Sequence, residues 1–292
     1  MKTQPMSKIV SAVLTFFVLV GIYSMPALAQ PGDLSEAAGT VLALAQAGEQ
    51  EDLQAFLEEL TVERRIEIVA ELAGRLGREQ VKSSFPLLFK VLVFIQPNEG
   101  VSALAAAVEA SEGSPEVVRS AMRGLIDGAL SHPTLENEEQ RQAAAARVVE
   151  AAAAAAVRVA EENDRIDVVN IAFAIAQGVI QAIPPGELAR ARLQVVAEAM
   201  ARGGVGAARR PNQPAVARAM MLALAAIEDV DMRRAAVAGV MAGGEAAGGL
   251  AAADRMIPLR DTLNQVLPIL AAPVAPDLPI IPTVIPEEVS PY

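Results

Sequence analysis

Apolar residues recur at helical spacing along most of the chain. Ile66, Val69 and Leu72 share one face of a helix predicted for residues 61–77, and Thr61 precedes them in the position of an N-cap. Similar runs, separated by Gly, Pro and capping residues, follow one another from residue 33 to about residue 265. The alternation of apolar and polar residues that is typical of strands is nearly absent before residue 270. The pattern predicts an all-α fold.

One predicted helix is expected to be the most buried of the N-terminal half. It starts at residues 84–86 and carries an apolar run, residues 87–95, which only Lys90 interrupts and Pro97 ends. A longer helix, predicted for residues 135–162, has a centre made mostly of Ala and Val. Its charged side chains fall on one narrow stripe, which favours close neighbours on its other sides over a free-standing alanine-rich helix. The stripe consists of Glu136, Arg147, Glu150, Arg158 and Glu161.

The next predicted helix has an amide face and ends before the two prolines at 184–185. Asn170, Gln177 and Gln181 share that face, and apolar residues cover the rest. Residues 168–186 carry no charge, so a membrane span is one interpretation. The aligned amides and the proline stop favour a buried amphipathic helix instead.

Two stretches of the chain are alike. Residues 115–122 and 214–221 share Pro, Val, Arg and Met at matching offsets, and residues 231–237 are a weaker echo. This pattern resembles the second helix of HEAT-type repeats, where a proline start and an arginine recur, over about 25 residues and without a fixed period. The resemblance implies an irregular stack of helical hairpins, either α-solenoid-like or a multi-helix bundle, within residues 30–265. If this domain has two sub-bundles, they divide near residues 131–135.

The N-terminus has the three parts of a secretory signal. Lys2 and Lys8 precede residues 9–23, which carry no charge, and residues 27–29 form the small-x-small motif of a signal peptidase site. We predict a signal peptide at residues 1–29 and a mature chain that starts at Gln30, with an uncleaved anchor as the alternative. The mature protein is then expected in the periplasm or outside the cell, without a membrane span.

The composition narrows the class of function. The chain has 35 acidic and 24 basic residues, and removal of the two signal lysines lowers the formal net charge from −11 to −13. This balance argues against nucleic acid and anionic membranes as partners. The lack of Cys excludes a disulfide framework, and the lack of Trp and scarcity of other aromatic residues argue against sugar clefts and stacking sites for single strands.

Few residues are candidates for catalysis or metal binding. His132 is the single histidine and lies in a predicted loop, and no Gly-x-Ser-x-Gly motif accompanies it. Zinc would need several His or Cys ligands, and the carboxylates at 161–167 and 228–231 lack the spacing of a calcium loop. Glycines at 203–206 and 239–249 lack a following Lys-Ser or Lys-Thr and are expected in a turn or a tight helix crossing. We predict no catalytic residue, metal or cofactor, and leave open a hydrolase that uses only carboxylates.

Methionines gather in the last third of the chain. A surface lined by Met accepts varied apolar ligands or partner helices, although these spacings also fit gap-filling core residues such as Met200. The candidates for binding a small apolar ligand are Met220, Met221, Met232, Met241 and Met256.

Residues 266–292 form a proline-rich tail. Pro273, Pro276, Pro279 and Pro282 recur every third residue, which is the period of polyproline II, so an extended conformation is predicted. The tail is too apolar for a solvated linker, and we expect it either to strap the chain's own helices or to dock on a partner or a second copy. The residues expected to make these contacts are Leu278, Ile280, Ile281, Val284 and Ile285.

These patterns predict an exported, non-enzymatic helical scaffold of the cell envelope or exterior, which binds a protein partner or itself. The alternative is a carrier or chaperone that holds an apolar molecule between Met-rich helices.

Overall fold

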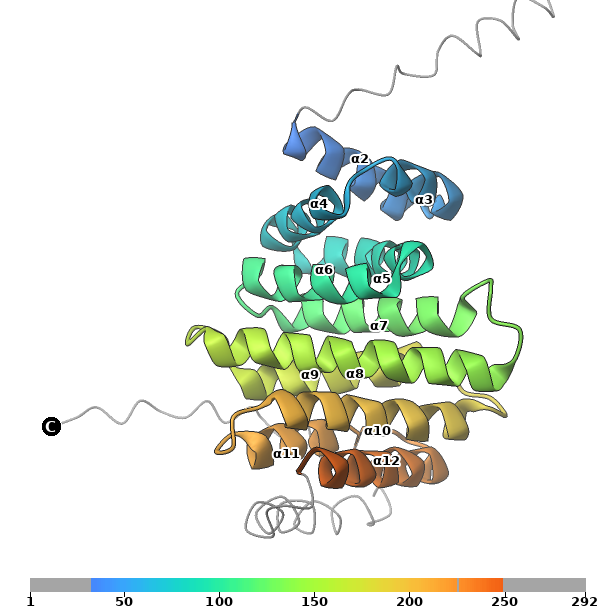
Figure 1. Ribbon diagram of the computed structural model, residues 1–292, viewed down its shortest axis with the longest axis vertical. Helices are drawn as coiled ribbons and strands as arrows, with labels where there is room; N and C mark the ends of the chain where they lie inside the picture. Colours follow the sequence, from blue (N-terminus) through green and yellow to red (C-terminus); the bar gives the residue numbers. More distant parts are fainter. Residues whose placement is uncertain (1–32, 225, 249–292) are drawn as a thin grey trace, which may run out of the picture.

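The computed structural model describes residues 33–224 and 226–248, and this part of the chain consists of α-helices with short connections and no strand (Figure 1). The all-α prediction is confirmed. The signal segment, the helix predicted after residue 249 and the proline-rich tail lie outside the described residues. The helices are α2 (Leu34–Ala47), α3 (Gln50–Glu58), α4 (Val62–Arg75), α5 (Arg78–Ile95), α6 (Pro97–Ala110), α7 (Pro115–Ser131), α8 (Glu138–Glu162), α9 (Val168–Ala182), α10 (Ala189–Ala207), α11 (Gln213–Leu224) and α12 (Val230–Gly248).

The helices form two layers. Each helix packs against the helix two places further along the chain, so that α4, α6, α8, α10 and α12 follow one another in an even layer and α3, α5, α7, α9 and α11 in an odd layer. The stack runs along the long axis of the molecule, from α2 and α3 at one end to α11 and α12 at the other (Figure 1). The predicted stack of helical hairpins is confirmed, and its arrangement is that of an α-solenoid. The predicted division near residues 131–135 stays a prediction; the α6–α8 and α7–α9 packings cross it.

Neighbouring helices of the even layer run parallel. Ion pairs join α8 to α10 and its following turn at three levels: Glu138 with Arg192, Glu150 with Arg202, and Glu161 with Arg209, at 2.6, 3.6 and 3.5 Å. The partners occur in the same order along both segments, which only a parallel arrangement allows. Each hairpin therefore repeats the direction of the one before it.

An arginine recurs at the fourth position of four even-layer helices. Arg65 of α4, Arg141 of α8 and Arg233 of α12 each donate to a backbone carbonyl before their own helix, at 2.8, 3.3 and 3.2 Å. Arg192 has the same position in α10 and donates instead to Glu138. This repeat was not found from the sequence. The predicted echo at 115–122 and 214–221 falls on α7 and α11, which are both in the odd layer.

Two predicted helix boundaries are wrong. The helix expected to start at residues 84–86 starts at Arg78, and Pro86 lies inside it. Residues 78–83 have helical propensity, and Val81 among them is fully buried, so packing extends α5 toward the N-terminus. The apolar pattern also predicts a helix over about residues 231–242, but this helix continues through the glycines to Gly248, because Gly239 and Gly243 lie against the backbone of α10.

Glycines allow helices of one layer to approach backbone to backbone. A Cβ at Gly128 of α7 would lie 2.9 Å from Lys90 O of α5, and a Cβ at Gly178 of α9 would lie 2.8 Å from Arg119 O of α7. Gly203 of α10 likewise has no room for a Cβ beside Glu150 O. Of the two alternatives predicted for the glycine-rich segments, a turn or a tight helix crossing, the structure shows the crossing at Gly203, Gly239 and Gly243. No helix of residues 33–224 and 226–248 is both long and apolar enough to span a bilayer.

Candidate interaction surfaces

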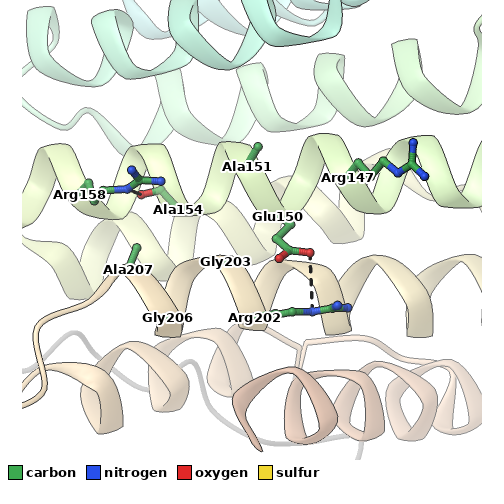
Figure 2. Close-up of a pocket in the computed structure, with 9 residues that line it drawn as sticks. All are labelled: Arg147, Glu150, Ala151, Ala154, Arg158, Arg202, Gly203, Gly206 and Ala207. Carbon is green, nitrogen blue, oxygen red and sulfur yellow. Dashed lines mark hydrogen bonds and ion pairs between the residues drawn. The ribbon is translucent and has the colours of Figure 1, made fainter. Parts of the chain in front are cut away.

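An open groove runs between α8 and α10 on the even layer. Its floor carries almost no side chain, because Ala151 and Ala154 of α8 face Gly203, Gly206 and Ala207 of α10. The groove has a volume of about 720 Å³. We call it the arginine groove, since Figure 2 shows Arg147 and Arg158 toward its two ends and Glu150 reaching across to Arg202 at its centre.

The charges of the arginine groove differ between its centre and its ends. Arg202 is neutralised, with Glu150 at 3.6 Å and Glu198 at 3.2 Å. Among the described residues no carboxylate pairs with Arg147 or Arg158, and the Arg158 Nε donates to the Ala154 carbonyl of its own helix at 3.2 Å. The two cations are available to an incoming anion.

The two free arginines face the same way. They are eleven residues apart, which corresponds to about 16 Å along α8 and to just over three full turns. An extended polypeptide advances about 3.3 Å per residue, so carboxylates about five residues apart match this spacing. The groove is suited to an extended acidic segment whose backbone lies over the Ala and Gly floor.

The predicted charged stripe of α8 is confirmed at three of its five positions. Arg147 and Arg158 are exposed and Glu150 is half-buried. Glu136 lies in the loop before α8. Glu161 departs from the prediction: it is buried and accepts hydrogen bonds from the side chain of Asn212 and the backbone of Arg209, which fix the turn after α10. The sequence showed no sign of this contact, because its partners lie about fifty residues away.

A second surface lies on α9, where the predicted amide face is open to solvent: Asn170 and Gln181 are exposed and Gln177 is half-buried. This agrees with the amphipathic helix that the aligned amides predicted. The remaining faces of α9 pack against α7, α8, α10 and α11. The stripe has no charged residue, and Phe173 keeps 37% of its surface exposed. We call this surface the amide stripe; it consists of Val169, Asn170, Phe173, Gln177, Ile180 and Gln181.

A cleft of about 330 Å³ lies at the C-terminal end of the amide stripe. Gln181 belongs to both the amide stripe and the cleft. The cleft is also lined by prolines and by the ion pair of Lys90 and Asp127 at 3.0 Å. Arg123 also lines the cleft and pairs with no carboxylate among the described residues. The full lining is Pro86, Leu87, Lys90, Arg123, Asp127, Gln181, Ala182 and Pro184.

The single histidine has a structural setting. His132 caps the C-terminus of α7, and its ring meets Phe94 edge-on with 5.6 Å between ring centroids. Its Nδ1 lies 2.9 Å from Thr134 Oγ1. The prediction that His132 is a loop residue agrees with this position.

The carboxylate clusters form caps and ion pairs. Asp167 accepts from the backbone of Val169 at 2.8 Å and starts α9, and Asp229 does the same for Met232 of α12. Asp231 pairs with Arg190 at 2.8 Å. In the part of the chain that the structure describes, no three His, Cys, Asp or Glu side chains are grouped so as to hold a metal ion.

The methionines occupy several environments. Met200, Met220 and Met221 are fully buried, whereas Met232 and Met241 are partly buried against the core. Met232 also borders a cleft beside the α9–α10 loop. Met256 lies outside the described residues, and the apolar ligand proposed for this group stays a prediction.

The stack of hairpins agrees with the arrangement that the HEAT-type resemblance implied, while membership of that family stays a resemblance. Comparisons of the chain with protein family models, with curated proteins and with solved structures find no match.

Proposed function

We propose that the protein is an exported, non-enzymatic scaffold that binds partner proteins along the outer faces of its helical stack, with the arginine groove as a docking site for an extended acidic segment. The observation that carries the proposal is the pair Arg147 and Arg158, which flank an open floor of small residues and have no carboxylate partner within the described helices. Export is supported by the signal-like N-terminus.

The floor supports a peptide rather than a compact ligand. A groove without long side chains lets a backbone lie close to both helices, and the groove runs along them rather than into the core. The even layer is a stack of parallel helices, and such stacks present extended binding surfaces.

The expected affinity is low for one segment. An exposed ion pair contributes roughly 0.2–1 kcal/mol, so two arginines and the floor support binding in the micromolar range or weaker. A partner with several acidic segments would gain by avidity. Binding should weaken as salt is added, because the cations are exposed and screened.

The proposal is tested with a defined probe. The mature protein is isolated from the exported fraction, and N-terminal sequencing verifies where it starts. It is then titrated into a fluorescent peptide of alternating Glu and Ala, and fluorescence anisotropy is measured at low salt. Arg147→Glu combined with Arg158→Glu is expected to reduce affinity at least about tenfold, because two attractive contacts become repulsive.

A matched control distinguishes binding at the arginine groove from an effect of the protein's net charge. Arg123→Glu combined with Arg218→Glu makes the same change in net charge on exposed odd-layer positions. This control should leave affinity within about twofold of the unaltered protein. Equal losses in both double variants, or no loss in the groove variant, would show that the arginine groove is not the docking site.

A further inference from the structure

The amide stripe of α9 is chemically unlike the surface around it. It offers the side-chain amides of Asn170, Gln177 and Gln181, each with two N–H donors, beside the exposed ring of Phe173. It carries no charge, so an apolar occupant would desolvate no ion there. The arginine groove lacks this property, because burying Arg147 or Arg158 under an apolar chain would be costly.

One segment of this chain has the complementary chemistry. Residues 278–286 carry no charge and contain Pro279, Pro282 and Pro286 among apolar side chains. An extended proline-rich chain forms no internal hydrogen bonds, so its carbonyls need donors from elsewhere, while each proline lacks an N–H. Amide side chains provide such donors, and an aromatic ring gives the apolar contact on which proline-rich segments dock.

The dimensions agree. The amide stripe extends over thirteen residues of α9, or about 18 Å from first to last, which an extended proline-rich chain covers with about six residues. The remaining residues of the 278–286 segment would reach the cleft that begins at Gln181. Besides the Lys90–Asp127 ion pair, that cleft is lined by apolar groups and by Arg123, which has no carboxylate partner in residues 33–224 and 226–248.

The chain also leaves the stack at a suitable end. Helix α12 runs parallel to α10, and a Cβ at Gly206, near the C-terminus of α10, would lie 3.6 Å from the Cβ of Ala247. Helix α9 starts at this same end, because it joins α10 as the antiparallel member of a hairpin. If the residues up to about 265 are helical, as their pattern predicts, the chain between Gly248 and Leu278 still spans up to about 70 Å, several times the spacing of neighbouring helices.

We infer that residues 278–286 dock on the amide stripe of the same molecule, with Leu278, Ile280, Ile281, Val284 and Ile285 against Phe173 and the cleft. The segment acts as an intramolecular strap that covers the odd layer. This inference is independent of the arginine groove, which lies on the other layer.

The absence of cysteine makes the test direct, because introduced cysteines are the only ones present. Gln177→Cys is combined with Ile281→Cys in the full chain, and the rate of intramolecular disulfide formation is followed by mass and gel mobility. The control combines Arg147→Cys with Ile281→Cys, since Arg147 is exposed on the opposite layer. Val284→Cys replaces Ile281→Cys in a second pair of variants to allow for a shift in register.

A strap predicts crosslinking to Gln177→Cys at least about tenfold faster than to Arg147→Cys in one of the two registers, because a free tethered tail would present a similar effective concentration to both layers. Similar rates at both positions in both registers would overturn the inference. Disulfides that form between molecules and disappear on dilution would overturn it too, because the occupant would then be a second copy.

Discussion

Arg192 holds Glu138 at the point where α10 meets α8. Its Nε and a terminal nitrogen donate to the two carboxylate oxygens at 2.6 and 2.7 Å, and Gln142 donates to the same carboxylate at 3.0 Å. The Arg192 guanidinium lowers the pKa of Glu138 from its usual 4.5 to about 2, and Gln142 acts in the same direction, while partial burial opposes both. Arg192 and Glu138 thus form a bidentate ion pair between the first turns of two neighbouring helices.

Replacing this carboxylate is expected to give a pH-dependent loss of stability. Because the pKa of Glu138 is lower in the folded state, the unfolded chain takes up the proton first, and the stabilisation is present above about pH 4.5 and lost as the pH falls toward 2. Glu138→Gln should lower the free energy of unfolding by roughly 1 kcal/mol at pH 7, a value reduced for solvent screening. The difference from the unaltered protein should shrink nearly to zero at pH 2.

Urea unfolding at pH 7, 4.5 and 2.5 measures this difference. Glu139→Gln is the control, since Glu139 is the exposed neighbour with no ion pair among the described residues. A difference for Glu138→Gln that stays constant across this range would contradict the expected linkage.

Helix contacts, more than helix propensity, decide where the elements of this fold begin and end. The cap of α4 by Thr61 follows from a local signal and was predicted, and the start of α7 at Pro115 follows from a proline at the first helical position. The start of α5 and the length of α12 were not predicted, because both depend on contacts between helices. Val81 is buried at the start of α5, and the glycines of α12 lie against α10. Local sequence therefore predicts the kind of element better than its limits.

The same distinction applies to the candidate surfaces. The stripe on α8 and the amide face of α9 were predicted from single-helix periodicity. The arginine groove was not predicted, because its second wall comes from α10. The cleft at the end of the amide face was not predicted either, because α5 and α7 contribute to its lining. Properties of one helix face can be predicted from the sequence here, and properties shared by two helices cannot.

A pair of glycine substitutions should separate these contributions. Gly39 lies on an exposed face of α2 with nothing within 4 Å of an added Cβ, so Gly39→Ala should raise the free energy of unfolding by about 0.5–1 kcal/mol. Gly203→Ala places a Cβ against the backbone of Glu150 and should lower it by about 1–3 kcal/mol. Denaturant titrations measure both, and stabilisation by both substitutions would refute the close contact between α8 and α10.

The molecule as a whole is a linear array of contacts. Helices α2 and α3 pack chiefly against each other and against α4 and α5, whereas α7 and α8 are covered by pairs on both sides. In such an array the free energy of opening is a sum of neighbour terms and is smallest at an end.

Hydrogen exchange should therefore be graded along the stack. We expect the amides of α2 and α3 to exchange fastest among the described helices and those of α7 and α8 slowest, as measured by mass spectrometry of peptic fragments. Uniform protection across all these helices would instead show that they open as one cooperative unit.

The parallel order within each layer has a consequence for how the length of the protein can change. Helix α10 packs on α8 in the same orientation as α12 packs on α10. One hairpin can therefore be duplicated or lost without reversing the chain direction or building a new core. The new junction would need only a small residue at the crossing and an arginine at the fourth helical position, both of which a duplicated hairpin brings with it. Proteins descended from this one are therefore expected to differ by whole hairpins rather than by insertions within a helix.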